Sequence, residues 1–211
     1  MVSWSAAAGV VVVALGVVLT PGPNMVHLAS RSIAQGRRAG LISLAGVTAG
    51  FVVYLVAASS GLSAAFAAVP AALDVVKVAG ACYLLHLARG VLRPGGASAF
   101  TPRRLAPHSG QRLFLTGLTT NLLNPKIALM YAALLPQFVT AGAGPTWQQF
   151  LQLGAVQIVV AVTVNGAVVL GAAGISSWLQ ARPRALSVQR VVTGSVLAVF
   201  AVEMVATSAQ R

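Results

Sequence analysis

Long apolar stretches separated by short polar loops dominate this chain of 211 residues. Each stretch is near or above the roughly 20 helical residues that cross about 30 Å of hydrocarbon. The stretches lack the alternation of a membrane β-strand, so the pattern predicts helices. The six predicted spans run roughly over Trp4–Ala29, Leu41–Ala65, Ala71–Leu92, Leu113–Val139, Gln148–Leu170 and Leu186–Thr207.

Composition strengthens this prediction, because 57% of the residues are apolar and only 8% are charged. A soluble domain carries about a quarter charged residues. We therefore predict an all-α membrane protein with a single transmembrane domain over residues 1–211. The net charge of +12 comes from basic residues between the apolar runs. Membrane orientation accounts for that pattern better than nucleic-acid binding does.

The arginines predict the orientation, because they occupy alternate loops and positive charge stays on the cytoplasmic side. The loops around residues 67–70 and 140–146 carry none. We expect the arginine-bearing loops in the cytosol and both termini outside. The loop arginines are Arg31, Arg37 and Arg38, then Arg89, Arg93, Arg103, Arg104 and Arg112, and finally Arg182, Arg184 and Arg190.

Residues 93–112 form a segment rich in Pro, Gly, Ser and Arg that predicts a cytoplasmic linker. The linker separates a first half, about 1–92, from a second half, about 113–211. Each half holds three predicted spans, and an odd number gives the two halves opposite topology. This is the arrangement of transporters built from inverted repeats.

The first span is interrupted by Pro21, Gly22, Pro23 and Asn24. The continuous helix former before it, Ala6–Leu19, covers only about 21 Å, which is too short to cross a bilayer. A proline has no N–H and blocks the carbonyl four residues earlier. We therefore expect the carbonyls of Val17 and Leu19 to lose their helical partners.

The fourth span repeats the interruption at Asn121, Asn124 and Pro125, and Pro125 is expected to free the carbonyl of Asn121. Unwound backbone survives in a membrane only where it lines a cavity. Paired breaks at corresponding positions of two halves therefore indicate a substrate-binding site, and simple proline kinks are the alternative.

Lys126 favours the binding site. A lysine near the middle of the membrane costs about 2.5–3.5 kcal/mol on insertion scales, so it should face a cavity or a partner. It lies about 13 residues from either end of its apolar run, too deep for snorkelling. We predict that it binds a substrate carboxylate.

Three more polar residues are candidates with structural alternatives. His27 follows the first break by one turn and is either a site residue or an interior histidine. Gln157 and Asn165 share one side of the fifth span, where helix–helix hydrogen bonds are the usual role and cavity lining is the alternative. The sequence has no phosphate-binding loop, metal-ligand set or catalytic triad, so we expect no enzyme, cofactor or metal site.

Four sequence blocks together resemble the LysE/RhtB family of amino-acid exporters. The resemblance runs in order from about Leu19 to Val139, and beyond it only hydropathy and spacing agree. It adds Tyr83 as a candidate site residue. The blocks are Thr20–Asn24, Gln35–Gly40, Gly80–Leu84, and Asn121–Lys126 with Leu135–Phe138.

The resemblance implies a six-helix inner-membrane carrier that expels amino acids or close derivatives, with protons as the coupling ion. Many members have an acidic residue after the glycines of the second span, where this chain has Phe51 after Gly50. That difference favours small neutral substrates over lysine or arginine. Homodimer formation is an open question at this point. Two alternative functions also stay open, namely export of another small solute and a membrane scaffold or assembly factor that transports nothing.

Overall fold

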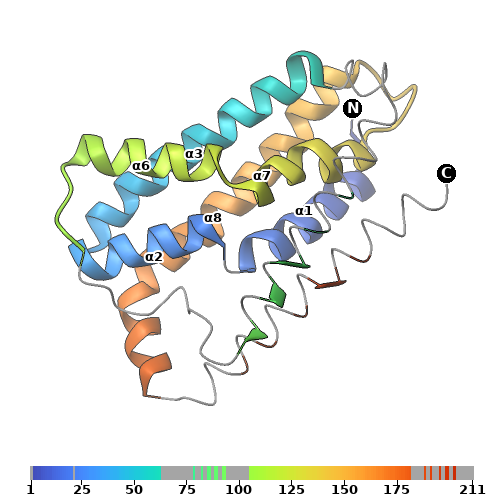
Figure 1. The fold of residues 1–211 in the computed structure, drawn as a ribbon. Helices are drawn as coiled ribbons and strands as arrows, with labels where there is room; N and C mark the ends of the chain where they lie inside the picture. The colour runs from blue at the N-terminus through green and yellow to red at the C-terminus, as the bar shows by residue number, and fades with distance from the viewer. Residues whose placement is uncertain are drawn as a thin grey trace.

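The computed structural model describes residues 2–20, 22–62 and 105–181, with scattered residues over 78–93 and 188–202. The third and sixth predicted spans, Tyr83 and most of the linker lie outside the described residues. The described part is a bundle of helices (Figure 1). Its elements are α1 (Trp4–Leu19), α2 (Pro23–Gln35), α3 (Arg37–Ala57), η1 (Ala58–Leu62), α6 (Gly110–Leu122), α7 (Pro125–Leu129), η2 (Met130–Leu134), η3 (Leu135–Phe138) and α8 (Thr146–Gln180).

The first predicted span is a bent pair of helices, which confirms its interruption. Helices α1 and α2 meet at a bend of 57°. Gly22 is the N-cap of α2 and Pro23 its first residue, a position where the missing N–H of proline is harmless. Pro21 lies outside the described residues. The α2 helix continues to Gln35, beyond the predicted end at Ala29.

The fourth predicted span is also broken where expected. Helix α6 ends at Leu122, and Asn124 caps the N-terminus of α7 by accepting a hydrogen bond from the Lys126 N–H. Pro125 takes the first position of α7. Beyond α7 the helix first widens in the π-helical η2 and then tightens in the 3-10 helix η3.

Two helices are long and apolar enough to cross a membrane, namely Arg37–Gly61 and Thr146–Trp178, and the bent pair makes a third if it is one span. Helix α8 extends to Gln180, ten residues beyond its predicted end. The described residues therefore confirm a helical membrane protein. Six spans in two inverted halves stay a prediction.

Glycines let α3 and α6 approach closely. A side chain at Gly46 would overlap the backbone carbonyl of Phe114, and one at Gly117 would overlap that of Ser43. Small residues commonly mediate such contacts between membrane helices. Helix α8 crosses behind this pair, and α1, α2 and α3 all pack against it (Figure 1).

Polarity in the bundle is reversed relative to a soluble protein. Large apolar side chains are exposed along the outside, including Val12, Val53 and Val159. The buried set includes Asn24 and Lys126, types that are almost never fully buried in water-soluble folds without partners. Hydrocarbon around the bundle accounts for both observations.

The turn between α2 and α3 lies beside the start of α6 at one end of the bundle (Figure 1), and four arginines on these segments define what we call the arginine end. The opposite end is held by neutral groups, such as the Val2 N–H that donates to Gln152. The assignment of the arginine end to the cytosol stays a prediction. The arginines at that end are Arg31, Arg37, Arg38 and Arg112.

Candidate functional site

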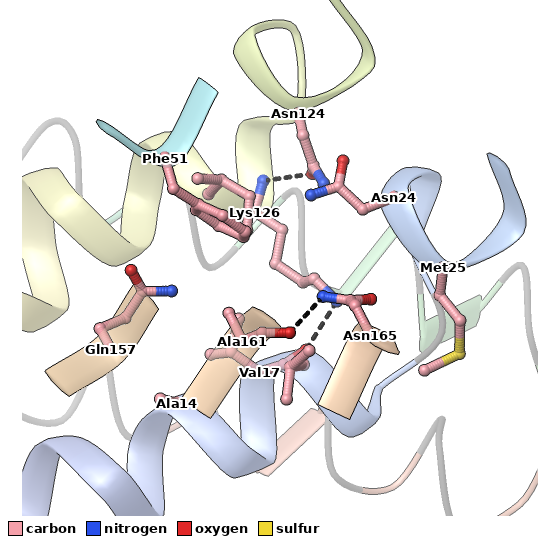
Figure 2. Close-up of a pocket in the computed structure, with 12 residues that line it drawn as sticks. Ala14, Val17, Asn24, Met25, Phe51, Asn124, Lys126, Gln157, Ala161 and Asn165 are labelled. Carbon is pink, nitrogen blue, oxygen red and sulfur yellow. Dashed lines mark hydrogen bonds between the residues drawn. The ribbon is translucent and has the colours of Figure 1, made fainter. Parts of the chain in front are cut away.

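The two helix breaks meet at a buried cavity, to which α1, α2, α3, α7 and α8 all contribute (Figure 2). The cavity volume is about 20 Å³, enough for about one water molecule. A solute larger than water therefore requires the walls to move. The lining residues are Ala14, Val17, Val18, Asn24, Met25, Phe51, Asn124, Lys126, Ile127, Gln157, Ala161 and Asn165.

Lys126 joins one break to the other. Its side chain is only 6% exposed, and its ammonium donates to the backbone carbonyls of Val17 and Thr20, each at 2.7 Å. Such short distances are typical of charge-assisted hydrogen bonds. Figure 2 shows the side chain running from α7 toward α1. The Val17 carbonyl, which was expected to lose its helical partner at Pro21, accepts from Lys126 instead, as does the Thr20 carbonyl. The loss of a partner by the Leu19 carbonyl stays a prediction.

The end of α1 attracts a cation for two reasons. The last carbonyls of a helix lack intrahelical partners, and they carry the negative end of the helix dipole. Gly22 then leaves room, because a Cβ at that position would lie 2.9 Å from the Lys126 Nζ. The acids of this chain, Asp74 and Glu203, lie outside the described residues, and within the described part the charge of Lys126 is stabilised by backbone carbonyl dipoles.

Three asparagines around Lys126 present hydrogen-bonding atoms to the cavity. Both amide atoms of Asn24, the Nδ2 of Asn124 and the Oδ1 of Asn165 are buried and have no hydrogen-bond partner within the described part of the chain. A buried polar group without a partner costs about 1–3 kcal/mol. Such groups are consistent with a site that is completed by a ligand or water.

Helix α8 supplies Gln157 and Asn165, and both line the cavity. The Tyr131 hydroxyl donates to the Gln157 Oε1 at 2.6 Å, so the expected helix–helix hydrogen bond is confirmed for Gln157. Asn165 donates instead to Ala161 of its own helix at 2.8 Å. Both alternatives therefore hold for Gln157, and Asn165 is a lining residue.

The expectation of a free Asn121 carbonyl is wrong. The N–H of Asn124 donates to it at 3.0 Å, because the chain turns back at the end of α6. The Asn121 side chain is buried against Gly50, where a Cβ would lie 2.6 Å from its Oδ1, and it does not line the cavity. The adjacent Leu122 carbonyl accepts from Tyr54 at 2.7 Å.

The other candidates take different places. His27 is half-buried outside the cavity lining, and its Nε2 has no partner among the residues that the structure describes. The apolar wall made by Met25 and Phe51 was not predicted, since apolar side chains in a membrane span carry no distinguishing pattern. Tyr131 was missed too, although a hydroxyl little more than one turn beyond Lys126 was an available signal.

A second polar cluster lies at the arginine end. The Arg31 guanidinium donates to the Ala106 carbonyl at 3.1 Å and to Gln35 at 3.2 Å, and its Nη2 lies 3.3 Å from the His108 Nε2. Gln35 also bonds the backbone of His108 in both directions. The cluster ties α2 to the segment that enters α6. Because a guanidinium only donates, His108 must accept and is neutral in this contact.

The His108 contact predicts a stability that depends on pH. Burial lowers the pKa of His108, and the charges of Arg31 and Arg112 lower it further. Below about pH 6.5 the histidine binds a proton in the unfolded chain but not in the folded protein, so the free energy of unfolding falls as the pH drops. We expect the melting temperature to fall more between about pH 7.5 and 5.5 in the wild type than in His108→Gln, whose amide oxygen still accepts. The other histidines, His27 and His86, are present in both proteins, so equal falls would contradict the prediction.

A helical membrane protein that buries a cation and unpaired amides at two helix breaks has the architecture of a solute carrier. The chain belongs to the LysE type translocator family, whose family model matches residues 15–208. It is 34% identical over 163 residues to a homoserine/homoserine lactone efflux protein of Salmonella typhimurium, covering 77% of this chain and 78% of the relative. It is 25% identical over 196 residues to a leucine efflux protein of Salmonella choleraesuis, covering 90% of each chain. No solved structure gives a significant match.

Proposed function

We propose that this protein is a secondary exporter of small neutral amino acids or their derivatives, located in the inner membrane and driven by the proton gradient. Membership of the LysE family and the names of both relatives support export of amino-acid-like solutes. The observation that carries the proposal is the ammonium of Lys126, buried between two broken helices and surrounded by amide atoms without partners.

The substrate carboxylate binds Lys126 and the N–H groups at the start of α2. That helix begins at Gly22 without a side-chain cap, and its N-terminus is the positive end of the helix dipole. The substrate ammonium binds near the end of α1, helped by the amide oxygens of Asn24 and Asn165. Phe51 and Met25 supply an apolar wall for a small side chain.

Transport follows from relative movement of the two three-helix halves around the breaks. The cavity holds about one water molecule, which supports a conformation closed on the substrate-free site. The arginine end faces the cytosol, and both termini face outward. Release of the Arg31–His108 cluster opens the cytosolic side.

Charge selectivity tests the proposed substrate class. A cationic side chain places a second positive charge about 6 Å from Lys126, which at an effective dielectric near 20 costs about 2–3 kcal/mol, or roughly 30- to 150-fold in affinity. We expect homoserine, threonine and leucine to exchange with a labelled neutral amino acid in proteoliposomes, and lysine and arginine to compete far more weakly.

Several outcomes of this assay would contradict the proposal. Preferential exchange of lysine or arginine would place an acid from outside the described residues beside Lys126. Exchange of a different solute class would favour the alternative carrier, and no exchange by a folded protein would favour a scaffold. The coupling ion is tested by net transport of a labelled amino acid. If protons drive export, an uncoupler that collapses the proton gradient should abolish that net transport.

Topology has its own test in a background where Cys82 is replaced by serine. We expect a cysteine at Ser109, at the arginine end, to resist an impermeant thiol reagent added to intact cells, and one at Ala141 to react. Both positions are exposed, so accessibility alone does not separate them. Labelling of Ser109→Cys and protection of Ala141→Cys would show that the orientation is opposite to the predicted one.

A further inference from the structure

The end of α1 holds a cation site that is already filled. The carbonyls of Val17 and Thr20 converge on one ammonium, that of Lys126, with equal distances of 2.7 Å. Pro21 carries no N–H that could serve the Val17 carbonyl, so that oxygen depends on a donor from another helix. The Thr20 carbonyl, at the C-cap of α1, accepts from the same ammonium. An ammonium presents three N–H groups, and a primary amine of a substrate presents the same three.

We infer that the Val17 and Thr20 carbonyls form an ammonium site shared in turn by Lys126 and the substrate: Lys126 fills it in the closed protein, and the substrate's α-ammonium replaces it. This inference rests on the proposed function and narrows its substrate class. The replacement requires a ligand that carries both a free ammonium and a free carboxylate.

The cavity makes the exchange necessary. It holds about one water molecule, so an amino acid cannot enter beside Lys126 while the side chain keeps its present position. Lysine is the most movable part of the wall, because it is long and flexible, and the space next to its Nζ is bounded by Gly22, which has no side chain. The ammonium can therefore leave α1 for a carboxylate bound at the start of α2.

Charge explains why both substrate groups are needed. A zwitterion supplies one ammonium for the α1 carbonyls and one carboxylate for the displaced Lys126, so no charge is left without a partner. An amine without a carboxylate would place two cations in the cavity, and like charges in a site of low dielectric repel strongly. An acid without an amine would draw Lys126 away and leave buried carbonyls without donors.

The test compares amino acids with their decarboxylated amines on the purified full-length protein. The pairs are leucine with 3-methylbutylamine and homoserine with 3-aminopropan-1-ol, with binding measured by calorimetry or thermal shift. In the wild type we expect each amine to bind at least about tenfold more weakly than its amino acid. In Lys126→Met, a neutral side chain of similar length, the carbonyl site is vacant. The amines should then gain about tenfold in affinity, and the amino acids should lose.

Arg38→Met is the matched control, because it removes an exposed cation by the same substitution and should keep the wild-type order. A folded Lys126→Met that gains no affinity for either amine would overturn the inference. Lys126→Gln replaces it if the methionine variant does not fold. If neither variant folds, the wild type decides, since an amine that binds as tightly as its amino acid contradicts the exchange. A wild type that binds no amino acid, with amines bound by Lys126→Met, would overturn the proposed function and keep the ammonium site.

Discussion

Lys126→Ala is expected to reduce export by roughly 30-fold or more while the protein remains in the membrane. Removing one partner of a buried charge pair costs about 2–5 kcal/mol, and each 1.4 kcal/mol is a factor of ten in affinity or rate. The substrate carboxylate would lose its cation and the α1 carbonyls their donor. Export of a radiolabelled neutral amino acid from preloaded cells, normalised to the amount of protein in the membrane, measures the effect.

The stability of this variant reports on a separate contribution of Lys126. Removing a buried charge alone should leave the fold no less stable. The carbonyls of Val17 and Thr20 would however lose their donor, at about 1–3 kcal/mol each. These effects oppose one another, so we expect a folded protein with a modest change in melting temperature. Arg38→Ala is the control with unchanged export, and wild-type export by Lys126→Ala would refute the carboxylate site.

The positions of both breaks could be predicted from sequence because proline acts locally. Pro23 and Pro125 each begin a new helix, as the loss of an N–H and the clash with a carbonyl require. The burial of Lys126 could also be predicted, since its distance from the ends of its apolar run ruled out snorkelling to the membrane surface. These conclusions depend on residues close in sequence and on the thickness of the bilayer.

The partners of these groups could not be predicted, because they depend on how distant helices meet. The Asn121 carbonyl finds a donor in the tight turn at Asn124, and the sequence alone does not specify that turn. The ammonium of Lys126 meets the carbonyls of Val17 and Thr20, each more than 100 residues away along the chain. The direction in which a terminal carbonyl points depends on the bend between α1 and α2, which packing determines.

The contact between α3 and α6 predicts the second large effect, a loss of stability in Gly46→Ala. The added Cβ would overlap the Phe114 backbone carbonyl, and a backbone atom cannot move aside as the end of a flexible side chain can. Overpacking of this kind costs about 1–3 kcal/mol and occasionally more. Because α6 leads directly into the Asn124 break, a shift of this helix should also displace Lys126 and weaken substrate binding.

Gly166→Ala provides a matched control on α8. Its added Cβ would lie 3.8 Å from Leu44, an ordinary contact, and alanine favours a helix over glycine by roughly 0.5–1 kcal/mol. Both variants gain the helix propensity of alanine, so we expect them to differ by the overpacking cost of about 1–3 kcal/mol, with Gly166→Ala at least as stable as the wild type. Thermal unfolding in detergent compares them directly, with the loss of monodisperse protein as the measured signal. Equal melting temperatures would mean that α3 and α6 do not approach as closely in the membrane as the glycines allow.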